Sequence, residues 1–356
     1  MTVAGEDIRG AEHTGNSFLF QRRFLPMFTG FTLGVFTDNM LKQALLIGLT
    51  YSLITLPWVS NPQIILPVAG ALFAFAVLVF SPISGQVADK YETSMLFRRT
   101  KFAELILMLT AAVGFFLNNG PLLILILFLM GVQSAFFSPA RIGGMPKYLR
   151  ADELVRGNGI CYGGLFVANL TGYAVGGGLI ELPNGPALIS LILVGFALAG
   201  WLAVLLAPYA RADSPELKID WNIFAQTARM ISMVAAEPPV VRPLLGGGFF
   251  WFIAAAITVA FPLITLEVLH AKGTVATAMM AIFAIGGLIG AAVTSIIPKQ
   301  NSGLGYSTLA FITAIVVNII LFAICQGMMV TQDGDLLTLT EFFSLPGGIA
   351  LALLFI

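Results

Sequence analysis

The sequence predicts an all-α polytopic membrane protein, and three observations lead to this fold class. Hydrophobic residues make up 58% of the 356 residues and charged residues only 10%, and the mean hydropathy is +0.93. An aqueous core cannot hide so much apolar surface. The apolar residues occur in runs of about 20, the length that an α-helix needs to cross about 30 Å of hydrocarbon. Membrane-spanning strands would need about half that length and would alternate in polarity.

About ten membrane-spanning helices follow from these runs and from the charged or Pro/Gly-rich breaks between them. The helices are expected over residues 24–54, 63–87, 100–118, 121–138, 157–181, 186–208, 243–267, 273–297, 305–327 and 340–356. Six of them precede the longest connection. The chain therefore divides into an N-terminal segment, a six-helix bundle, a linker and a second bundle. These domains cover residues 1–23, 24–208, 209–242 and 243–356.

The second bundle is expected to be incomplete. Its last apolar run continues to Ile356 without a polar flank. A helix that stops inside hydrocarbon leaves its last carbonyl groups unsatisfied, which is costly. We therefore expect the sequence to be a fragment. At the other end, the first 23 residues are polar and contain no apolar segment with a cleavage site, so no signal peptide is expected.

The lysines and arginines predict the orientation in the membrane. All 18 except Lys42 and Lys272 fall in the N-terminal segment or in alternate connections. They are Arg9, Arg22, Arg23, Lys90, Arg98, Arg99, Lys101, Arg141, Lys147, Arg150, Arg156, Arg211, Lys218, Arg229, Arg242 and Lys299. Because basic residues accumulate on the cytoplasmic side, we expect the N-terminus and the linker in the cytoplasm.

The linker contains apolar residues at helical spacing, from Ile223 to Val234. Asp220 is the expected N-cap, and Trp221 lies beside it. This pattern is typical of an amphipathic helix in the membrane interface. A packed linker helix without any contact to lipid fits the pattern equally well.

A polar cluster, Thr37, Asp38, Asn39 and Lys42, lies within the first apolar run. Ionisable residues inside a bilayer are costly and usually face a cavity or a partner. Asp38 follows Arg23 by 15 residues, or about 22 Å along a helix, which places it a little past the midplane. The i, i+4 spacing puts Asp38 and Lys42 on one face, where they can neutralise each other. The pair either only fixes helix packing or belongs to a polar site for a zwitterionic or charged headgroup.

The connection after the second run contains a glycine, an acid four residues later and then basic residues. These residues are Gly85, Asp89, Lys90, Arg98 and Arg99. Gly85 permits a close approach of helices, and Asp89 can hold the basic loop and the positive N-terminus of a neighbouring helix. This pattern predicts a latch that closes one side, although any cytoplasmic loop also contains acids and bases. The corresponding loop after Gly290 has Lys299 but no acid.

Two further charged positions have alternative interpretations. Glu104 follows Lys101 by three residues near the start of the third run, and we expect an ion pair at the membrane interface here, not an acid in mid-membrane. Arg141 comes just after a helix end at Ser138-Pro139. Its planar guanidinium suits a lipid phosphate, but a basic residue on this side also serves topology alone.

The fifth run combines polar residues with many glycines. Asn169 and Thr171 are candidates for lining a path. The glycines are Gly163, Gly164, Gly172, Gly176, Gly177 and Gly178. Tight helix packing is the more common role of glycines at this density. Glu181, Glu267 and His270 are expected to be solvated residues at the opposite helix ends.

Four blocks in the first half resemble the lysophospholipid transporter family of the major facilitator superfamily. They are Phe36-Thr37-Asp38-Asn39 with Lys42-Gln43-Ala44-Leu45, Gly85-Gln86-Val87-Ala88-Asp89, Ser138-Pro139-Ala140-Arg141 and Glu153-Leu154-Val155-Arg156-Gly157-Asn158-Gly159. From the seventh helix onward the likeness is limited to hydropathy and the Phe250-Trp251 region. No basic residue occurs between Arg242 and Lys272 to receive a phosphate. The first block looks most like members fused to an acyltransferase and an acyl-acyl-carrier-protein synthetase.

The resemblance implies a major facilitator fold and a flippase for lysophospholipid, chiefly lysophosphatidylethanolamine. Movement would be inward across the bacterial inner membrane by alternating access. Asp38 and Asn39 would belong to the headgroup pathway, Lys42 would partner Asp38, and Arg141 would be the cation at the cytoplasmic mouth. The implied partners are the lysophospholipid substrate, membrane lipids and a fused or associated acyltransferase.

Other functional classes find little support in the sequence. The formal net charge is zero, so no global field attracts nucleic acid. No HxxxxD acyltransferase motif, P-loop, nucleophile elbow or metal cluster occurs, and we therefore expect no enzyme, no cofactor and no metal site. Cys161 and Cys325 lie in separate apolar runs and are expected to pack as small hydrophobic residues. The alternative function is a proton-coupled facilitator for a small polar solute or drug, with Asp38 as the coupling acid.

Overall fold

The computed structural model describes residues 18–57, 59, 62–296 and 335–355, together with short helical stretches between 312 and 324. Its helices are α1 (Leu25–Thr50), α2 (Pro62–Lys90), α3 (Thr93–Phe116), α4 (Gly120–Tyr148), α5 (Leu154–Ile180), α6 (Gly185–Leu205), α7 (Ile223–Ala235), α8 (Pro238–Glu267), α9 (Gly273–Ile296), α11 (Leu339–Ser344) and α12 (Pro346–Phe355). The described residues form no strand, and an isolated bridge joins Ala271 to Leu337.

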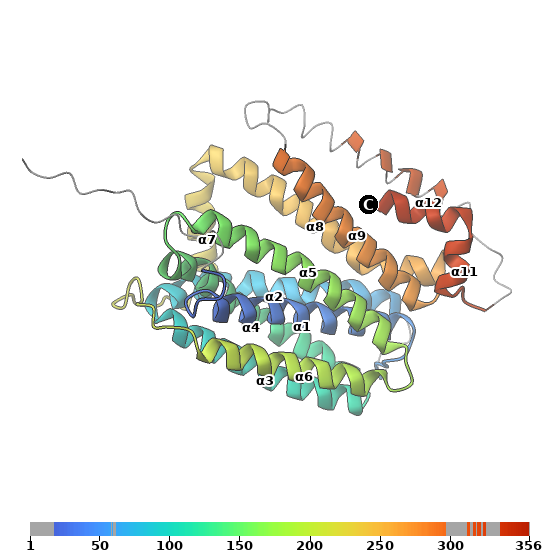
Figure 1. Ribbon diagram of the computed structural model, residues 1–356, viewed down its shortest axis with the longest axis horizontal. Coiled ribbons are helices and arrows are strands. Elements are labelled where there is room, and N and C mark those ends of the chain that lie inside the picture. Colours follow the sequence, from blue (N-terminus) through green and yellow to red (C-terminus); the bar gives the residue numbers. More distant parts are fainter. Residues whose placement is uncertain are drawn as a thin grey trace, which may run out of the picture.

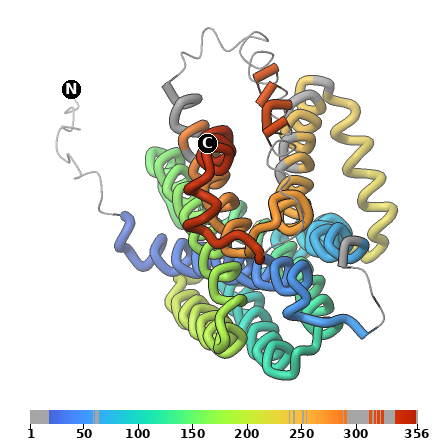
Figure 2. Tube along the Cα trace, turned by 90° about the vertical axis from the view of Figure 1, so that its right-hand side faces the viewer, coloured from blue at the N-terminus to red at the C-terminus, as the bar shows by residue number. Residues whose placement is uncertain are grey.

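The helices form two groups that lie side by side (Figure 1). Helices α1 to α6 lie side by side in one bundle, and α8, α9, α11 and α12 lie beside it. Helix α1 passes through the middle of the molecule (Figure 2) and contacts α2, α3, α4, α5, α6 and α8. Any polar side chain on α1 therefore meets protein on most sides of the helix.

Four of the described helices satisfy both the length and the apolarity of a membrane span. They are α2 (from Ile64), α4, α5 and α6. Helices α1, α3, α8 and α9 are 24 to 30 residues long, which also suffices to cross the hydrocarbon, and they run alongside the other four (Figure 1). The outer faces of the bundle carry exposed apolar side chains, for example Leu78, Ile106 and Leu191. Such a surface is stable in lipid but not in water.

The observed ends of α3 and α4 differ from the expected ones. Helix α3 begins at Thr93 instead of residue 100, because the Glu92 carboxylate caps it by accepting the backbone N–H groups of Ser94 and Met95. Helix α4 continues through Pro139 to Tyr148 instead of ending at residue 138. A proline inside a helix removes one hydrogen bond and displaces a carbonyl group one turn earlier. Membrane-spanning helices tolerate this because neighbouring helices can satisfy the freed backbone groups.

The remaining helix expectations agree with the structure within a few residues at most ends. The expected helix 305–327 lies mostly outside the described residues. The expected helix 340–356 is divided into α11 and α12 at Leu345, which precedes Pro346. This break is physically reasonable because the residue before a proline is disfavoured in the α conformation.

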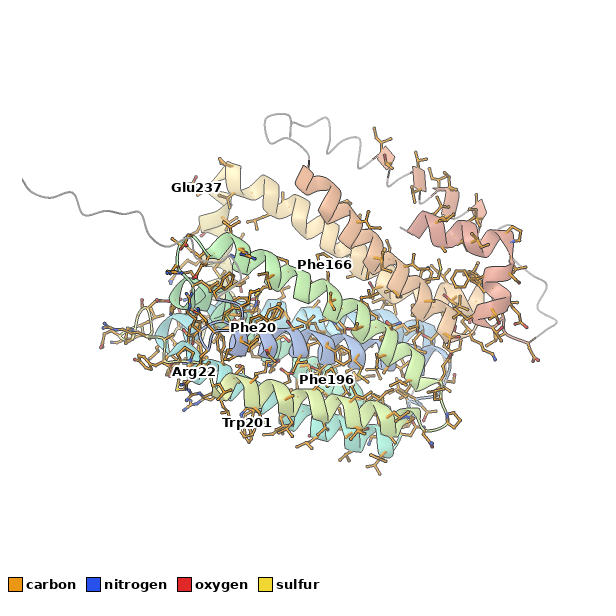
Figure 3. The ribbon with its side chains drawn as sticks, in the orientation of Figure 1. Phe20, Arg22, Phe166, Phe196, Trp201 and Glu237 are labelled. Atoms are coloured by element: carbon orange, nitrogen blue, oxygen red, sulfur yellow. The ribbon has the colours of Figure 1, made fainter. Side chains whose placement is uncertain are left out.

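Close packing of α1 against its neighbours fixes the geometry of the bundle. A Cβ added to Gly172 of α5 would lie 2.8 Å from the Phe36 carbonyl oxygen, and one added to Gly176 would overlap the Met40 carbonyl oxygen. These glycines thus permit direct contact of the α1 and α5 backbones. The opposite face of α1 is covered by α6, whose Phe196 ring lies 4.6 Å from the Phe36 ring (Figure 3). The packing interpretation of the α5 glycines is confirmed at these two positions.

The predicted linker helix is α7, but its N-cap differs from the expected one. Asn222 caps it by accepting the backbone N–H of Ala225 at 3.0 Å, while the Asp220 carboxylate accepts the N–H of Asn222. Phe224 is 88% exposed and Ile231 63% exposed. This apolar face is not covered by described residues, which favours the interfacial interpretation over a packed linker helix.

Candidate substrate site

Helices α1 to α5 line a cavity of about 300 Å³ in the first bundle. The four residues predicted for substrate binding, Asp38, Asn39, Lys42 and Arg141, all line it. The other lining residues are Phe31, Gly34, Val35, Phe73, Lys101, Glu104, Gln133, Ser134, Phe137, Ser138, Leu165, Asn169 and Tyr173. The cavity thus combines charged side chains with aromatic and aliphatic walls, as ligand pockets commonly do.

Asp38 and Lys42 share one face of α1 but do not form the expected ion pair. The Oδ2 atom of Asp38 accepts a hydrogen bond from Ser134 Oγ at 3.0 Å, and its Oδ1 atom is buried without a hydrogen-bond partner in the part of the chain that the structure describes. The Lys42 ammonium lies 4.5 Å from the centre of the Phe73 ring. The i, i+4 spacing is correct, but the two side chains turn toward α4 and α2. Neither group forms a contact ion pair with a described residue, and both line the cavity.

Asn39 connects α1 to α5 at the wall of the cavity. Its Nδ2 atom donates to Asn169 Oδ1 at 2.5 Å and to the Val35 carbonyl at 2.7 Å. Asn169 was one of two candidates in the fifth run and lines the cavity. Thr171, the other candidate, points away, because it is exposed and donates to the Val167 carbonyl of its own helix.

Arg141 lies inside α4, about two turns from Ser134, and not beyond a helix end as expected. Its guanidinium carbon lies 4.1 Å from the centre of the Phe31 ring, and none of the described residues gives its buried Nε atom a hydrogen-bond partner. None of the described carboxylates lies within 4.0 Å of it. A guanidinium of this kind presents a free cation to the cavity, and its geometry matches a phosphate.

Lys101 and Glu104 form the predicted ion pair, but the expectation that it lies at the membrane interface is wrong. The Lys101 Nζ and Glu104 Oε2 atoms are 2.6 Å apart, and the two side chains are only 1% and 3% exposed. Glu104 also accepts hydrogen bonds from Thr37 at 3.1 Å and from Gln133 at 3.1 Å. The pair is buried because α3 begins seven residues earlier than expected and α1 packs directly over it.

Comparison with known proteins places the chain in a family. The sequence profile of the Major Facilitator Superfamily matches residues 24–355. The chain belongs to the major facilitator superfamily. It is therefore a multi-pass membrane protein, and the two helix groups correspond to the two bundles of the major facilitator fold.

Two curated proteins illustrate the similarity. The chain is 27% identical over 267 residues to the lysophospholipid transporter LplT of Pectobacterium carotovorum subsp. carotovorum, covering 72% of the chain and 61% of that protein. It is 28% identical over 284 residues to the lysophospholipid transporter LplT of Salmonella heidelberg, covering 78% of the chain and 66% of that protein. The chain thus spans less than two thirds of the length of either relative.

The predicted latch of the major facilitator loop is not engaged in this structure. A Cβ added to Gly85 would meet no atom within 4 Å, so no close helix approach occurs there. Asp89 is exposed, and among the described residues it forms no ion pair with Lys90 or with Arg99. Arg98 instead donates to the Ala207 carbonyl at 3.1 Å. Latch formation therefore remains a prediction for another state of the transport cycle.

Glu92 is the acid that anchors this loop in the observed state. In addition to capping α3, its carboxylate accepts the backbone N–H of Ala210 at 3.1 Å. The backbone N–H of Thr93 donates to the Ala210 carbonyl at 3.1 Å. Partial burial alone would raise the pKa of Glu92, but the hydrogen bonds from Ser94, Ala210 and Met95 together outweigh it and hold this pKa below its ordinary value. The loop is thus fixed to the segment after α6.

The two bundles meet at the opposite end of the molecule. Glu181, at the end of α5, accepts the backbone N–H groups of Gly273 and Thr274 at the start of α9, and Tyr51 donates to the Ala271 carbonyl at 2.7 Å. Glu181 was expected to be a solvated boundary residue, and this expectation is wrong. From here α5 and α9 stay in contact as far as Phe166 (Figure 3), which lies 3.7 Å from a Cβ placed on Gly287.

Contacts become sparse toward the end where α1 and α5 begin. A Cβ added to Gly159 or Gly163 of α5 would meet no atom within 4 Å, and the same holds for Gly290 of α9. Arg22 and Glu237 both lie at this end (Figure 3). Hydrogen bonds between the two helix groups therefore close the Glu181 end, whereas these three glycines have no close neighbour among the described residues at the end that holds the N-terminal segment.

Proposed function

We propose that this transporter is a flippase that moves lysophospholipid, chiefly lysophosphatidylethanolamine, across the bacterial inner membrane. The observation that carries the proposal is the arrangement of charges in the cavity. Lys101 and Glu104 neutralise each other, which leaves one anion, Asp38, and two cations, Lys42 and Arg141, without an ion-pair partner among the described residues. A zwitterionic phosphate ester has complementary charges.

The geometry supports a specific pose for the headgroup. Arg141 suits the phosphate because its planar guanidinium can donate two parallel hydrogen bonds. Asp38 suits the ammonium group, because its buried Oδ1 atom has no hydrogen-bond partner among the described residues. Arg141 and Ser134 are separated by about two turns of α4, and Ser134 marks the position of Asp38. Asn39 and Lys42 complete the polar wall.

The volume of the cavity limits what it can hold. About 300 Å³ lies at the lower end of the range for ligand pockets, so it suits a headgroup and not a whole lysophospholipid. The acyl chain would stay in an apolar environment next to the bundle, where it costs nothing to desolvate. A cavity of this volume also suits the second candidate substrate, a small polar solute carried with a proton. The experiment below distinguishes lipid transport from solute transport.

Direction and orientation form part of the same proposal. The positive-inside pattern favours the end that holds the N-terminal segment as the cytoplasmic one. Because the opposite end is closed by the Glu181 and Tyr51 contacts, we accordingly assign the structure to an inward-facing state of alternating access. The disengaged latch at Asp89 agrees with an open cytoplasmic side. Lysophospholipid released there is the substrate that an acyltransferase would consume, whether fused to this chain or associated with it.

Uptake of labelled lysophosphatidylethanolamine into spheroplasts tests the proposal. Asp38→Asn and Arg141→Gln should each lower uptake by at least about tenfold, because each removes a charge-assisted contact of about 1.5 to 3 kcal/mol. Glu216→Gln and Arg211→Gln, at exposed positions, are the matched controls and should transport normally. Uptake at the wild-type rate in both cavity variants would contradict the assignment of Asp38 and Arg141 to the headgroup site. Transport of a small solute that depends on a pH gradient, without lipid uptake, would support the second candidate.

A further inference from the structure

One face of α1 leads from the cavity to the closed end of the transporter. It consists of Asn39, Gln43, Ile47 and Tyr51, spaced four residues apart. Asn39 lies at the cavity and contacts Asn169. Ile47 lies 2.8 Å from a Cβ placed on Gly273, beside the Glu181 contact, and Tyr51 bonds to the Ala271 carbonyl. Gln43 is therefore situated between the cavity and the interface that closes the path.

Gln43 is buried without any polar partner. Its exposed fraction is 0%, and neither its Oε1 nor its Nε2 atom has a hydrogen-bond partner among the described residues. It does not line the cavity itself. Its neighbours along α1, Leu41, Ala44 and Leu45, are fully buried apolar residues. An amide in this position is destabilising, since each unsatisfied polar group pays its full desolvation penalty. An apolar side chain would pack here at lower cost.

A buried amide without a hydrogen-bond partner calls for an explanation. One explanation is that its partners reach it only in another step of the transport cycle. The next residue of this face, Ile47, meets the start of α9 at Gly273. Alternating access requires this contact to separate when the closed end opens. Separation of α9 from α1 uncovers Ile47 first and then Gln43, one turn deeper. The amide then faces the opened path, directly beside Lys42.

We propose that Gln43 is a headgroup-binding residue of the transport path, used before the headgroup reaches the cavity. This inference rests on the proposed lysophospholipid transport. The amide offers an N–H donor to a phosphate oxygen and a carbonyl acceptor to an ammonium group, the two ends of a zwitterionic phosphate ester. From Gln43 the headgroup passes along α1 to Lys42, Asp38 and finally Arg141. Gln43 thus links the closed end to the charged residues of the cavity.

Thiol labelling tests the placement of Gln43. Gln43→Cys is made in a chain whose Cys161 and Cys325 are replaced by alanine, and spheroplasts are treated from outside with a membrane-impermeant, positively charged methanethiosulfonate. Leu45→Cys is the matched control, because Leu45 is equally buried but lies on another face of α1. The Gln43→Cys thiol should be labelled severalfold faster than the Leu45→Cys thiol, and added lysophosphatidylethanolamine should slow its labelling. Equal labelling of the two variants overturns the inference.

A transport assay tests whether the Gln43 amide binds the headgroup or has no role in transport. Gln43→Met has a similar length but no hydrogen-bonding group. It should keep or raise the unfolding temperature and yet lower lysophosphatidylethanolamine uptake about tenfold, the effect of one lost substrate hydrogen bond. Wild-type uptake in Gln43→Met contradicts the inference. The chain could move no lysophospholipid while Gln43→Cys is still labelled faster than Leu45→Cys. In that case the proposed substrate is wrong, but the position of Gln43 on the transport path is supported.

Discussion

The Glu181 carboxylate joins the end of α5 to the start of α9 through the backbone N–H of Gly273, at 2.7 Å. Its second oxygen accepts the N–H of Thr274 at 3.0 Å. These two N–H groups belong to the first turn of α9, which has no intrahelical acceptor for them, and the carboxylate also meets the positive end of the helix dipole. Because α5 and α9 belong to different bundles, this cap stabilises only states in which that end is closed.

Glu181→Ala should therefore shift the conformational equilibrium toward the state that is open at this end. Loss of a helix cap costs about 1 kcal/mol, which changes the ratio of the two states by about fivefold. Spin labels on Leu53→Cys and Lys272→Cys, both exposed, would report the change as a larger population of long distances. Glu267→Ala removes an exposed acid near the same end and is the control. An unchanged distance distribution in Glu181→Ala would show that the cap does not hold the gate.

Gly34→Ala should destabilise the first bundle. A Cβ at this position would overlap Lys101 Nζ and lie 3.3 Å from Glu104 Oε2, so the ion pair must move away from α1. Overpacking of this kind costs about 1 to 3 kcal/mol. Gly195→Ala is the control, because a Cβ there meets no atom within 4 Å. Thermal unfolding in detergent should show a lower midpoint for Gly34→Ala alone, and equal midpoints would contradict close packing of Gly34 on the ion pair.

Removal of one partner of the buried Lys101–Glu104 ion pair should lower the free energy of unfolding more than removal of both partners. Glu104→Gln leaves Lys101, which is 1% exposed, without a counter-charge and should lose about 3 to 5 kcal/mol. The double variant Lys101→Met/Glu104→Gln should recover part of this loss. A double-mutant cycle on the free energy of unfolding measures the coupling. A double variant less stable than Glu104→Gln would mean that Lys101 contributes mainly through its packing on Phe137.

The sequence predicted the polar face of α1 correctly because two strong rules act on it. Charges inside a membrane must avoid lipid, and helical periodicity puts residues four apart on one side. These rules placed Asp38, Asn39 and Lys42 toward a common cavity. They could not determine the rotamers, and for this reason they did not predict that Asp38 and Lys42 interact across a distance without forming a contact ion pair. The choice between Lys42 and Ser134 as the partner of Asp38 depends on α4, which is distant in sequence.

The residues that sequence reasoning missed have their partners on other helices. Gln133 and Ser134 stand out as adjacent polar residues in the apolar run of α4, and this signal alone would have marked them as facing inward. Glu181 gave no comparable signal, because a residue that caps a helix 92 positions later looks like any solvated helix end. The start of α3 was misplaced because hydropathy treats Arg98 and Arg99 as loop residues, although both lie within the helix.

Acidification should weaken the contact between the N-terminal segment and the α4–α5 connection. Glu153 accepts two hydrogen bonds of 2.6 Å from Arg23, and these bonds hold the pKa of Glu153 at about 2, below its ordinary value of 4.5. A depressed pKa means that the folded state binds its proton less readily than the unfolded state. The stabilisation is therefore complete above about pH 4.5 and is lost as the pH falls toward 2.

Unfolding midpoints of the wild type and of Glu153→Gln, measured between pH 7 and pH 3, test this dependence. At pH 7 the variant should be less stable by about 1 to 2 kcal/mol, because a charge-assisted, bidentate contact is lost. The difference should narrow below about pH 4.5, since the unfolded wild type then takes up the proton that the folded state resists. Glu216→Gln, at an exposed position, should show a constant difference. A gap between wild type and Glu153→Gln that does not change with pH would mean that packing, and not the carboxylate charge, holds Arg23 in place.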